Sequence, residues 1–131
     1  MAFPEAWLHK TIESAGGCKA YPAYVPRNAE IPFVLFTRQS TERERHLIDQ
    51  AAVPVAILAV SVYGQTYLGT KQLADRIRLA VDNFSGVADA VTIEHAYLTD
   101  EADGSPEFFE GEDVPTYSVE MTFEIRFRED P

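Results

Sequence analysis

The chain has 131 residues and a mass of 14.6 kDa, the size of one ordinary domain, so we expect a single domain over residues 1–131. Apolar residues make up 46% and charged residues 24%, which is typical of a globular rather than a disordered protein. The formal net charge of −10 excludes attraction to phosphate as the main way of holding nucleic acid. The single cysteine, Cys18, excludes an internal disulfide and is typical of a reducing cytoplasm.

The N-terminal residues lack the basic start and apolar centre of a secretory signal. The longest apolar stretch, residues 51–64, is shorter than the ~18 residues that a membrane helix needs, and Pro54 and Ser61 interrupt it. We therefore expect a soluble intracellular protein with no membrane partner.

The first half of the chain predicts one helix and two strands. Residues 4–15 have Pro4 at the first helical position, an apolar face, and two glycines after the last turn. Prolines in residues 20–26 predict an extended, irregular segment. Residues 33–38 are a predicted strand and the polar residues 39–50 a connection. Residues 53–63, apolar on both faces, predict a central strand in a sheet that is covered on both sides.

The second half predicts one helix and two further strands. A helix begins at Thr66 or Thr70, with its apolar stripe at positions 73, 77, 80, 81 and 84. Leu68 and Leu79 lie away from that stripe and indicate a second contact surface. A third strand lies within residues 87–99, and strict alternation over residues 117–128 predicts the last strand. The predicted class is α+β, in the order α-β-β-α-β-β, with a mostly antiparallel or mixed four-stranded sheet packed by helices.

The charge is unevenly distributed along the chain. Residues 1–66 contain six acids and six bases, whereas residues 67–131 contain fifteen acids and five bases. Residues 100–113 alone contain seven acids and no base, in a connection too long for a tight hairpin turn. A solvated loop explains this composition. Phe108 and Phe109 favour a sharper alternative, an aromatic anchor that buries in a neighbouring subunit. Calcium binding is a third interpretation, but the ligand pattern of a calcium loop is not present.

Motifs for catalysis are not found in the sequence. It contains no nucleophile elbow, phosphate-binding loop, zinc-protease motif or paired-cysteine motif. The three histidines, His9, His46 and His95, are never at the spacing of metal ligands. We therefore expect a protein that is not an enzyme and has no cofactor and no metal.

Several ordered features resemble a known family. They are Ala20-Tyr21-Pro22 with Pro26, then Pro32-Phe33-Val34, a charged excursion, a long apolar strand, the helix segment D-R-I-R-L-A-V at residues 75–81, and a final alternating strand. Together they span roughly residues 1–128. In this outline the chain resembles the small tail-completion or tail-terminator proteins of long-tailed bacteriophages and phage-like particles. The long acidic excursion at residues 100–113 departs from that pattern.

The resemblance implies a structural protein of the virion, located at the tail–head junction after assembly in the bacterial host cytoplasm. Its copies would form a ring, usually of six, that caps the tail tube and stops its polymerisation. The implied partners are further copies of the chain, the tail tube protein and the head–tail connector protein, with DNA passing through the bore without tight binding.

Two hypotheses assign residues to these surfaces. Arg43 and Arg45 are expected to meet an acidic surface of the adjacent subunit, and Phe108, Phe109, Leu68 and Leu79 to contribute to the subunit interface. Acids rather than arginines are expected to line the bore, because stable phosphate contacts would hold the DNA. The predicted lumen-facing acids are Glu101, Asp103, Glu110, Glu112 and Asp113.

Two alternative functions remain open at this point. One is a head-completion or connector protein of the neck. The other, from a different class, is a small-ligand-binding α+β module unrelated to phage. A hexamer at the tube end, a twelvefold collar and a stable monomer with a closed apolar pocket would distinguish the three.

Overall fold

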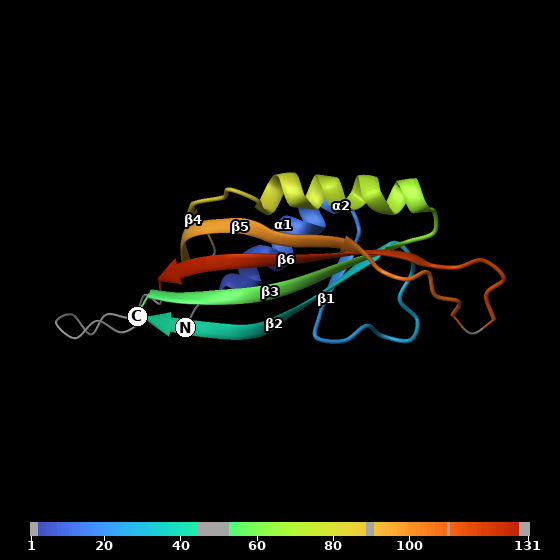
Figure 1. The fold of residues 1–131 in the computed structure, drawn as a ribbon, viewed down its shortest axis with the longest axis horizontal. Helices are drawn as coiled ribbons and strands as arrows, with labels where there is room; N and C mark the ends of the chain where they lie inside the picture. Colours follow the sequence, from blue (N-terminus) through green and yellow to red (C-terminus); the bar gives the residue numbers. More distant parts are fainter. Residues whose placement is uncertain (1–2, 45–52, 89–90, 110, 129–131) are drawn as a thin grey trace.

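A computed structural model describes residues 3–44, 53–88, 91–109 and 111–128 of the chain. Two helices and six strands follow one another in the order α-β-β-β-α-β-β-β (Figure 1). Their bounds are α1 Pro4–Gly16, β1 Lys19–Pro22, β2 Phe33–Glu44, β3 Val53–Gly64, α2 Tyr67–Val81, β4 Gly86–Ala88, β5 Val91–Asp103 and β6 Tyr117–Arg128.

All six strands belong to one mixed sheet with the spatial order β1-β2-β3-β6-β5-β4. Every neighbouring pair is antiparallel except β1 and β2, which are parallel. The predicted four-stranded sheet and α-β-β-α-β-β order are therefore wrong. The two missed strands, β1 and β4, lie at the sheet edges and have four and three residues, too few for an alternating pattern to be recognised.

Strand lengths also differ from the prediction at two places. β2 continues through residues 39–44, which the sequence indicated as a connection, and these residues pair with the beginning of β3. β5 continues to Asp103, so the first four residues of the predicted acidic connection belong to a strand. Both continuations are polar, and most of their side chains are exposed. β6, in contrast, has the predicted bounds, Tyr117–Arg128.

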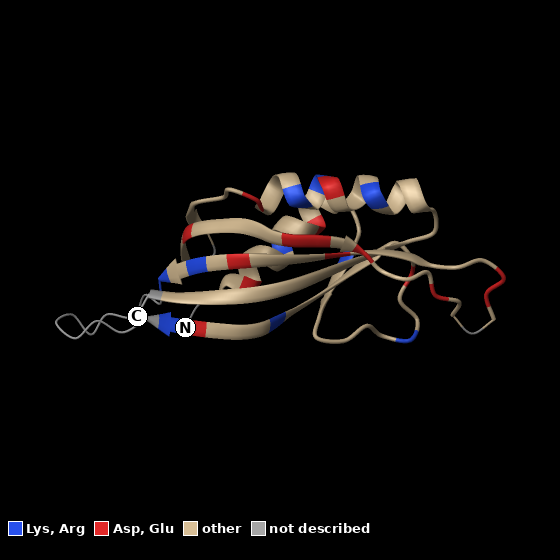
Figure 2. Cartoon of the chain, viewed as in Figure 1, with Lys and Arg blue, Asp and Glu red and all other residues tan. Residues whose placement is uncertain are grey.

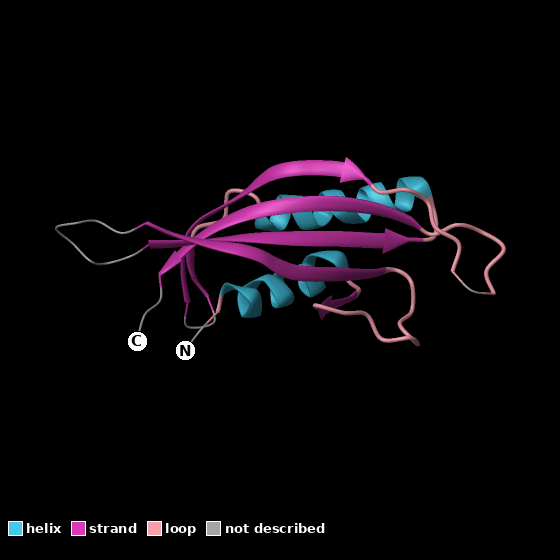
Figure 3. Ribbon diagram, turned by 60° about the horizontal axis from the view of Figure 1, so that its bottom comes forward, coloured by secondary structure: helices cyan, strands magenta, loops and turns pink. Residues whose placement is uncertain are grey.

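Both helices pack on the same face of the curved sheet (Figure 3). The core between the layers is built from one alternating set on each long strand; its largest fully buried members include Phe36, Leu58, Phe123, Leu8, Ile12 and Ile77. The opposite face, which carries Ile57, Tyr97 and Glu124, is covered by no helix in the described part of the chain. β3 is central in the sheet, as expected, but the prediction that both its faces are covered is wrong.

Local signals explain where the helices begin and end. α1 begins at Pro4, and Gly17 closes it in the left-handed conformation with φ 66°, donating its N–H to the Glu13 carbonyl. Before α2, the Thr66 side chain accepts a hydrogen bond of 3.1 Å from the N–H of Gly69. In the described ranges, neither helix is both long enough and apolar enough to cross a membrane.

Candidate assembly surfaces

The beginning of α2 is tied to the end of β5 by a polar network. Asp103 accepts hydrogen bonds from the Tyr67 hydroxyl at 2.7 Å and from Lys71 Nζ at 2.8 Å. The Tyr67 ring also lies edge-on to Tyr117, with 6.0 Å between ring centroids. These contacts fix one predicted lumen-facing acid, Asp103, beside the helix.

The same network shifts the acid–base equilibria of its members. Hydrogen bonds from Lys71 and then Tyr67 lower the pKa of the Asp103 carboxyl. The hydrogen bond to Asp103 raises the pKa of Lys71 and that of Tyr67. All three groups are exposed to solvent, so the network orients side chains without forming a buried charge cluster.

The connection between β5 and β6 forms an extension at one end of the molecule (Figure 1). Gly104 donates its N–H to the Ser118 carbonyl, and Glu107 and Thr116 exchange two backbone hydrogen bonds of 3.0 and 2.6 Å. Beyond this bridge Phe108 is 67% exposed. An exposed aromatic ring at the tip of an acidic extension is available for an anchor contact, but the anchor role stays a prediction.

A cleft of about 730 Å³ lies between this extension and the loop that joins β1 to β2. Phe33 and Tyr63 stack at its floor, with 4.9 Å between ring centroids. Burial, followed by the charges of Glu107 and Glu120, raises the pKa of Tyr63. The further lining residues are Val25, Pro26, Arg27, Ala29, Ile31, Phe109 and Glu112. Of the two predicted anchor rings, therefore, Phe109 turns toward the chain's own cleft and Phe108 does not line it.

The off-stripe leucines of α2 are exposed, as their position on the helix predicted. Leu68 is 70% and Leu79 is 65% exposed, near the two ends of the helix. Val87 in β4, not singled out from the sequence, is 75% exposed. These three large apolar side chains are therefore exposed on α2 and β4.

The basic candidates are separated from the acidic extension. Arg43 is exposed near the end of β2, and Arg45 lies outside the described residues. Figure 2 shows acids along the extension at one end of the molecule, and both bases and acids at the ends of β2, β5 and β6 at the other. The extension is therefore the acidic end of the molecule, whereas the opposite end has mixed charge.

The predicted lumen-facing acids do not form one cluster. Glu101 and Asp103 project from β5 on the helix-covered face, since they pair with the core residues Met121 and Val119. Glu112 lines the cleft and Asp113 is exposed in the extension, whereas Glu110 lies outside the described residues.

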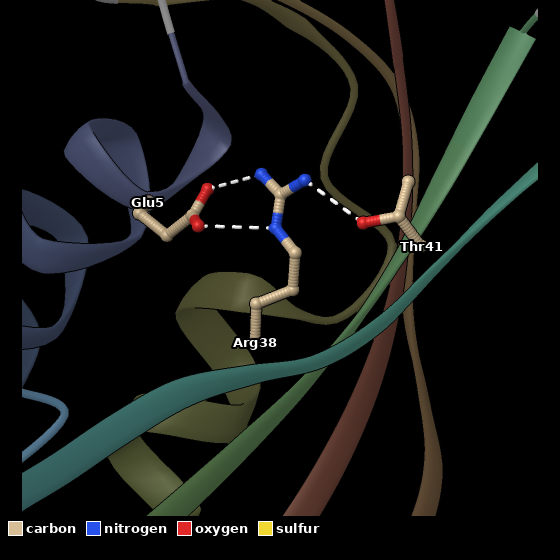
Figure 4. A network of polar contacts seen from close by, with 3 residues as sticks. All are labelled: Glu5, Arg38 and Thr41. Atoms are coloured by element: carbon tan, nitrogen blue, oxygen red, sulfur yellow. Dashed lines mark hydrogen bonds and ion pairs between the residues drawn. The ribbon is translucent and has the colours of Figure 1, made fainter.

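Sequence reasoning missed an ion pair that joins helix and sheet (Figure 4). Glu5 in α1 accepts two hydrogen bonds from Arg38 in β2, from Nε at 3.0 Å and from the second terminal nitrogen at 2.5 Å. The remaining terminal nitrogen donates to Thr41 Oγ1 at 3.0 Å. The signal was present: Arg38 alternates with Val34 and Phe36, so it points toward the core face and needs an acidic partner there.

In the described ranges, no group of three or more His, Cys, Asp and Glu side chains could hold a metal ion.

The fold is shared with a protein of a phage-like particle. A chain in the structure of the virion of the native gene transfer agent (GTA) particle superposes with a TM-score of 0.70, covering 93% of this chain and 92% of that one at 12% identity. A second solved chain superposes with a TM-score of 0.47 over 96% of this chain and 92% of that one, also at 12% identity. The sequence matches no protein-family profile and no curated protein sequence.

Proposed function

We propose that this chain is a structural subunit of a phage-like particle, of the tail-terminator type. The observation that carries the proposal is the likeness to a virion chain of the GTA particle, which extends over more than nine-tenths of both chains. A match of that extent concerns the whole subunit rather than a common sheet-and-helix motif. The tail-terminator role rests in addition on the ordered sequence features described above.

In this proposal several copies, six by the resemblance, close into a ring at the end of the tail tube. A ring needs two different patches that complement each other, because head-to-tail contacts close into a cycle. The chain offers different patches: exposed leucines on α2, an aromatic acidic extension at one end and arginines at the other. The ring would stop tube polymerisation and present a surface to the head–tail connector, without catalysing a reaction.

The bore of such a ring would be lined by acids or neutral groups. Stable phosphate contacts would retain the DNA, because each one releases counterions that must be taken up again for the DNA to move. Of the predicted lining acids, Glu101, Asp103, Glu112 and Asp113 are exposed, and Glu112 and Asp113 lie on the extension. A structure of the ring with lysines or arginines around its bore would overturn this part of the proposal.

Imaging particles that lack only this chain tests the function. Termination predicts overlong tails or tails without heads, and restoring the chain should return joined particles of uniform tail length. Normal joined tails would contradict the proposal. A twelvefold collar on the head side would favour a connector role instead, and the copy number counted in intact particles distinguishes that case.

A further inference from the structure

We propose that neighbouring copies join through their sheets, with the outer edge of β5 in one copy pairing with the outer edge of β2 in the next. This rests on the proposed ring and names the surfaces that close it. The partner is a second copy of this chain.

Each of these two long strands is paired along its outer edge in its first half and has no described strand beside that edge in its second half. β1 pairs only with Phe33 through Phe36, and the Ala23 N–H donates to the Phe36 carbonyl, so no described strand lies beside β2 beyond that point. β4 pairs only with Val91 to Ile93, and Ala96 bonds to the segment before β4. The outer edge of residues 99–103 likewise has no described strand beside it. An open edge is a template for another strand.

The direction of the strands makes this pairing antiparallel. β2 and β6 run one way and β3 and β5 the other, so a neighbour in the same orientation places its β2 antiparallel to β5. The short edge strands do not collide, because each covers only the beginning of its long neighbour and the open halves are the ends. One alignment sets Arg43 opposite Glu101, Glu42 opposite Ala102, and Thr41 opposite Asp103.

Charge disfavours one alternative pairing. The β5 edge carries Asp100, Glu101 and Asp103 and no base, so two β5 edges repel each other. The alignment above sets Arg43 opposite Glu101 on the same face, which is an attractive pair, and it also sets Glu44 opposite Asp100. The contact between β2 and β5 therefore depends on backbone pairing and on the Arg43–Glu101 pair, and it is head-to-tail, the type that closes rings.

The displacement between neighbouring copies that this alignment produces is compatible with a closed ring. Thr41 pairs across the sheet, through Ala56 and Ile125, with Ala96. Placing the next copy's Thr41 opposite Asp103 displaces that copy by about six residues, or about 20 Å, over four strand spacings of about 19 Å in total. The strands would then tilt by about 45°, close to the tilt of closed sheets.

The test uses the double variant Glu42→Cys/Ala102→Cys in a Cys18→Ser background. Both positions are exposed. Within one copy they lie three strand spacings (about 14 Å) apart across the sheet and about 20 Å apart along the strands, too far for an internal disulfide. Under mild oxidation we expect a ladder of disulfide-linked oligomers that ends at a closed ring. Each single-cysteine variant should stop at dimers. The matched control is Thr37→Cys/Ala102→Cys, in which the β2 position is displaced by about 13 Å, and it should give no ladder.

Mass measurement of the unmodified chain separates this inference from the proposed function. Rings from the unmodified chain without a ladder from the double-cysteine variant would overturn the edge pairing and leave the ring intact. A chain that stays monomeric beside its tube protein would overturn both.

Charge exchange provides an independent readout. Arg43→Glu should weaken self-association about fivefold, as should Glu101→Arg, and combining the two should restore it. Lys10→Glu, at an exposed position of α1, is the matched control and should leave association unchanged. If the double variant self-associates more weakly by the product of the two single-variant factors, the two residues do not interact, and the proposed alignment would be overturned.

Discussion

Glu5 in α1 holds the guanidinium of Arg38 in β2 with both carboxylate oxygens, which joins the first helix to the sheet across 33 residues of sequence. The same guanidinium lies 5.4 Å from the centre of the Phe127 ring, so it covers the end of the core. Arg38, one of the six bases in residues 1–66, is therefore part of the fold.

Removing this carboxylate should destabilise the fold. The two side chains are 32% and 21% exposed, so solvent screens the pair in part, and Glu5→Ala should lower the free energy of unfolding by about 1 kcal/mol. Urea unfolding measures the change. Glu30→Ala, which removes an exposed glutamate from the loop after β1, serves as the control and should have little effect. Equal stability of Glu5→Ala and the unmodified protein would show that the ion pair contributes nothing.

The Asp103 network predicts a dependence of stability on pH. The pKa of Asp103 is lowered in the folded state, so its contribution is present above the unfolded pKa near 4 and is lost as the pH falls through the folded pKa. Asp103→Asn should therefore be less stable than the unmodified protein at pH 7, and the difference should shrink below about pH 4. Denaturant midpoints at several pH values measure this. A difference that grows on acidification would contradict the network.

Gly64 allows β3 to pass directly beneath α2. A Cβ at this position would lie 2.2 Å from Thr70 Oγ1 and 3.3 Å from the Thr70 Cα. Gly64→Ala should lower the free energy of unfolding by about 1–3 kcal/mol through this overlap. In a Thr70→Ala background the same change should cost less, since the nearest atom is gone. If Gly64→Ala lowers the free energy of unfolding equally in the two backgrounds, the overlap with the Thr70 side chain is not its cause.

Cys18 should react slowly with alkylating reagents. Burial, the largest cause, raises the pKa of its thiol, although the charge of Arg76 opposes the shift. At pH 8 less thiolate is present than in a free cysteine, and the folded chain should be labelled by iodoacetamide more slowly than the urea-unfolded chain. Labelling of the folded chain at the rate of a free thiol would contradict this.

The sequence determined the long elements and missed the short ones for a physical reason. β6 was predictable because one face is buried and the other wet, so its alternation is strict over the whole strand. β1 and β4 each pair over only three or four residues at a sheet edge, and the prolines around Tyr21 favoured an irregular segment. Polar edge residues such as Ser40 and Asp100 carry no burial signal, so the ends of β2 and β5 could not be predicted from their composition.

The candidate surfaces were predictable only in part. Exposure of Leu68 and Leu79 follows directly from helix geometry. The different positions of Phe108, outside the cleft, and Phe109, in its lining, could not be predicted. They depend on how the extension folds back through the bridge between Glu107 and Thr116. Likewise, the separation of Glu101 from Glu112 required the register of β5, which the sequence did not define.

Self-assembly of the purified chain tests the central claim most directly. We predict that native mass measurement over a range of concentrations, alone and with the cognate tube protein, finds a closed oligomer at one fixed multiple of 14.6 kDa. A chain that remains at 14.6 kDa at every concentration, with and without the tube protein, would contradict the account.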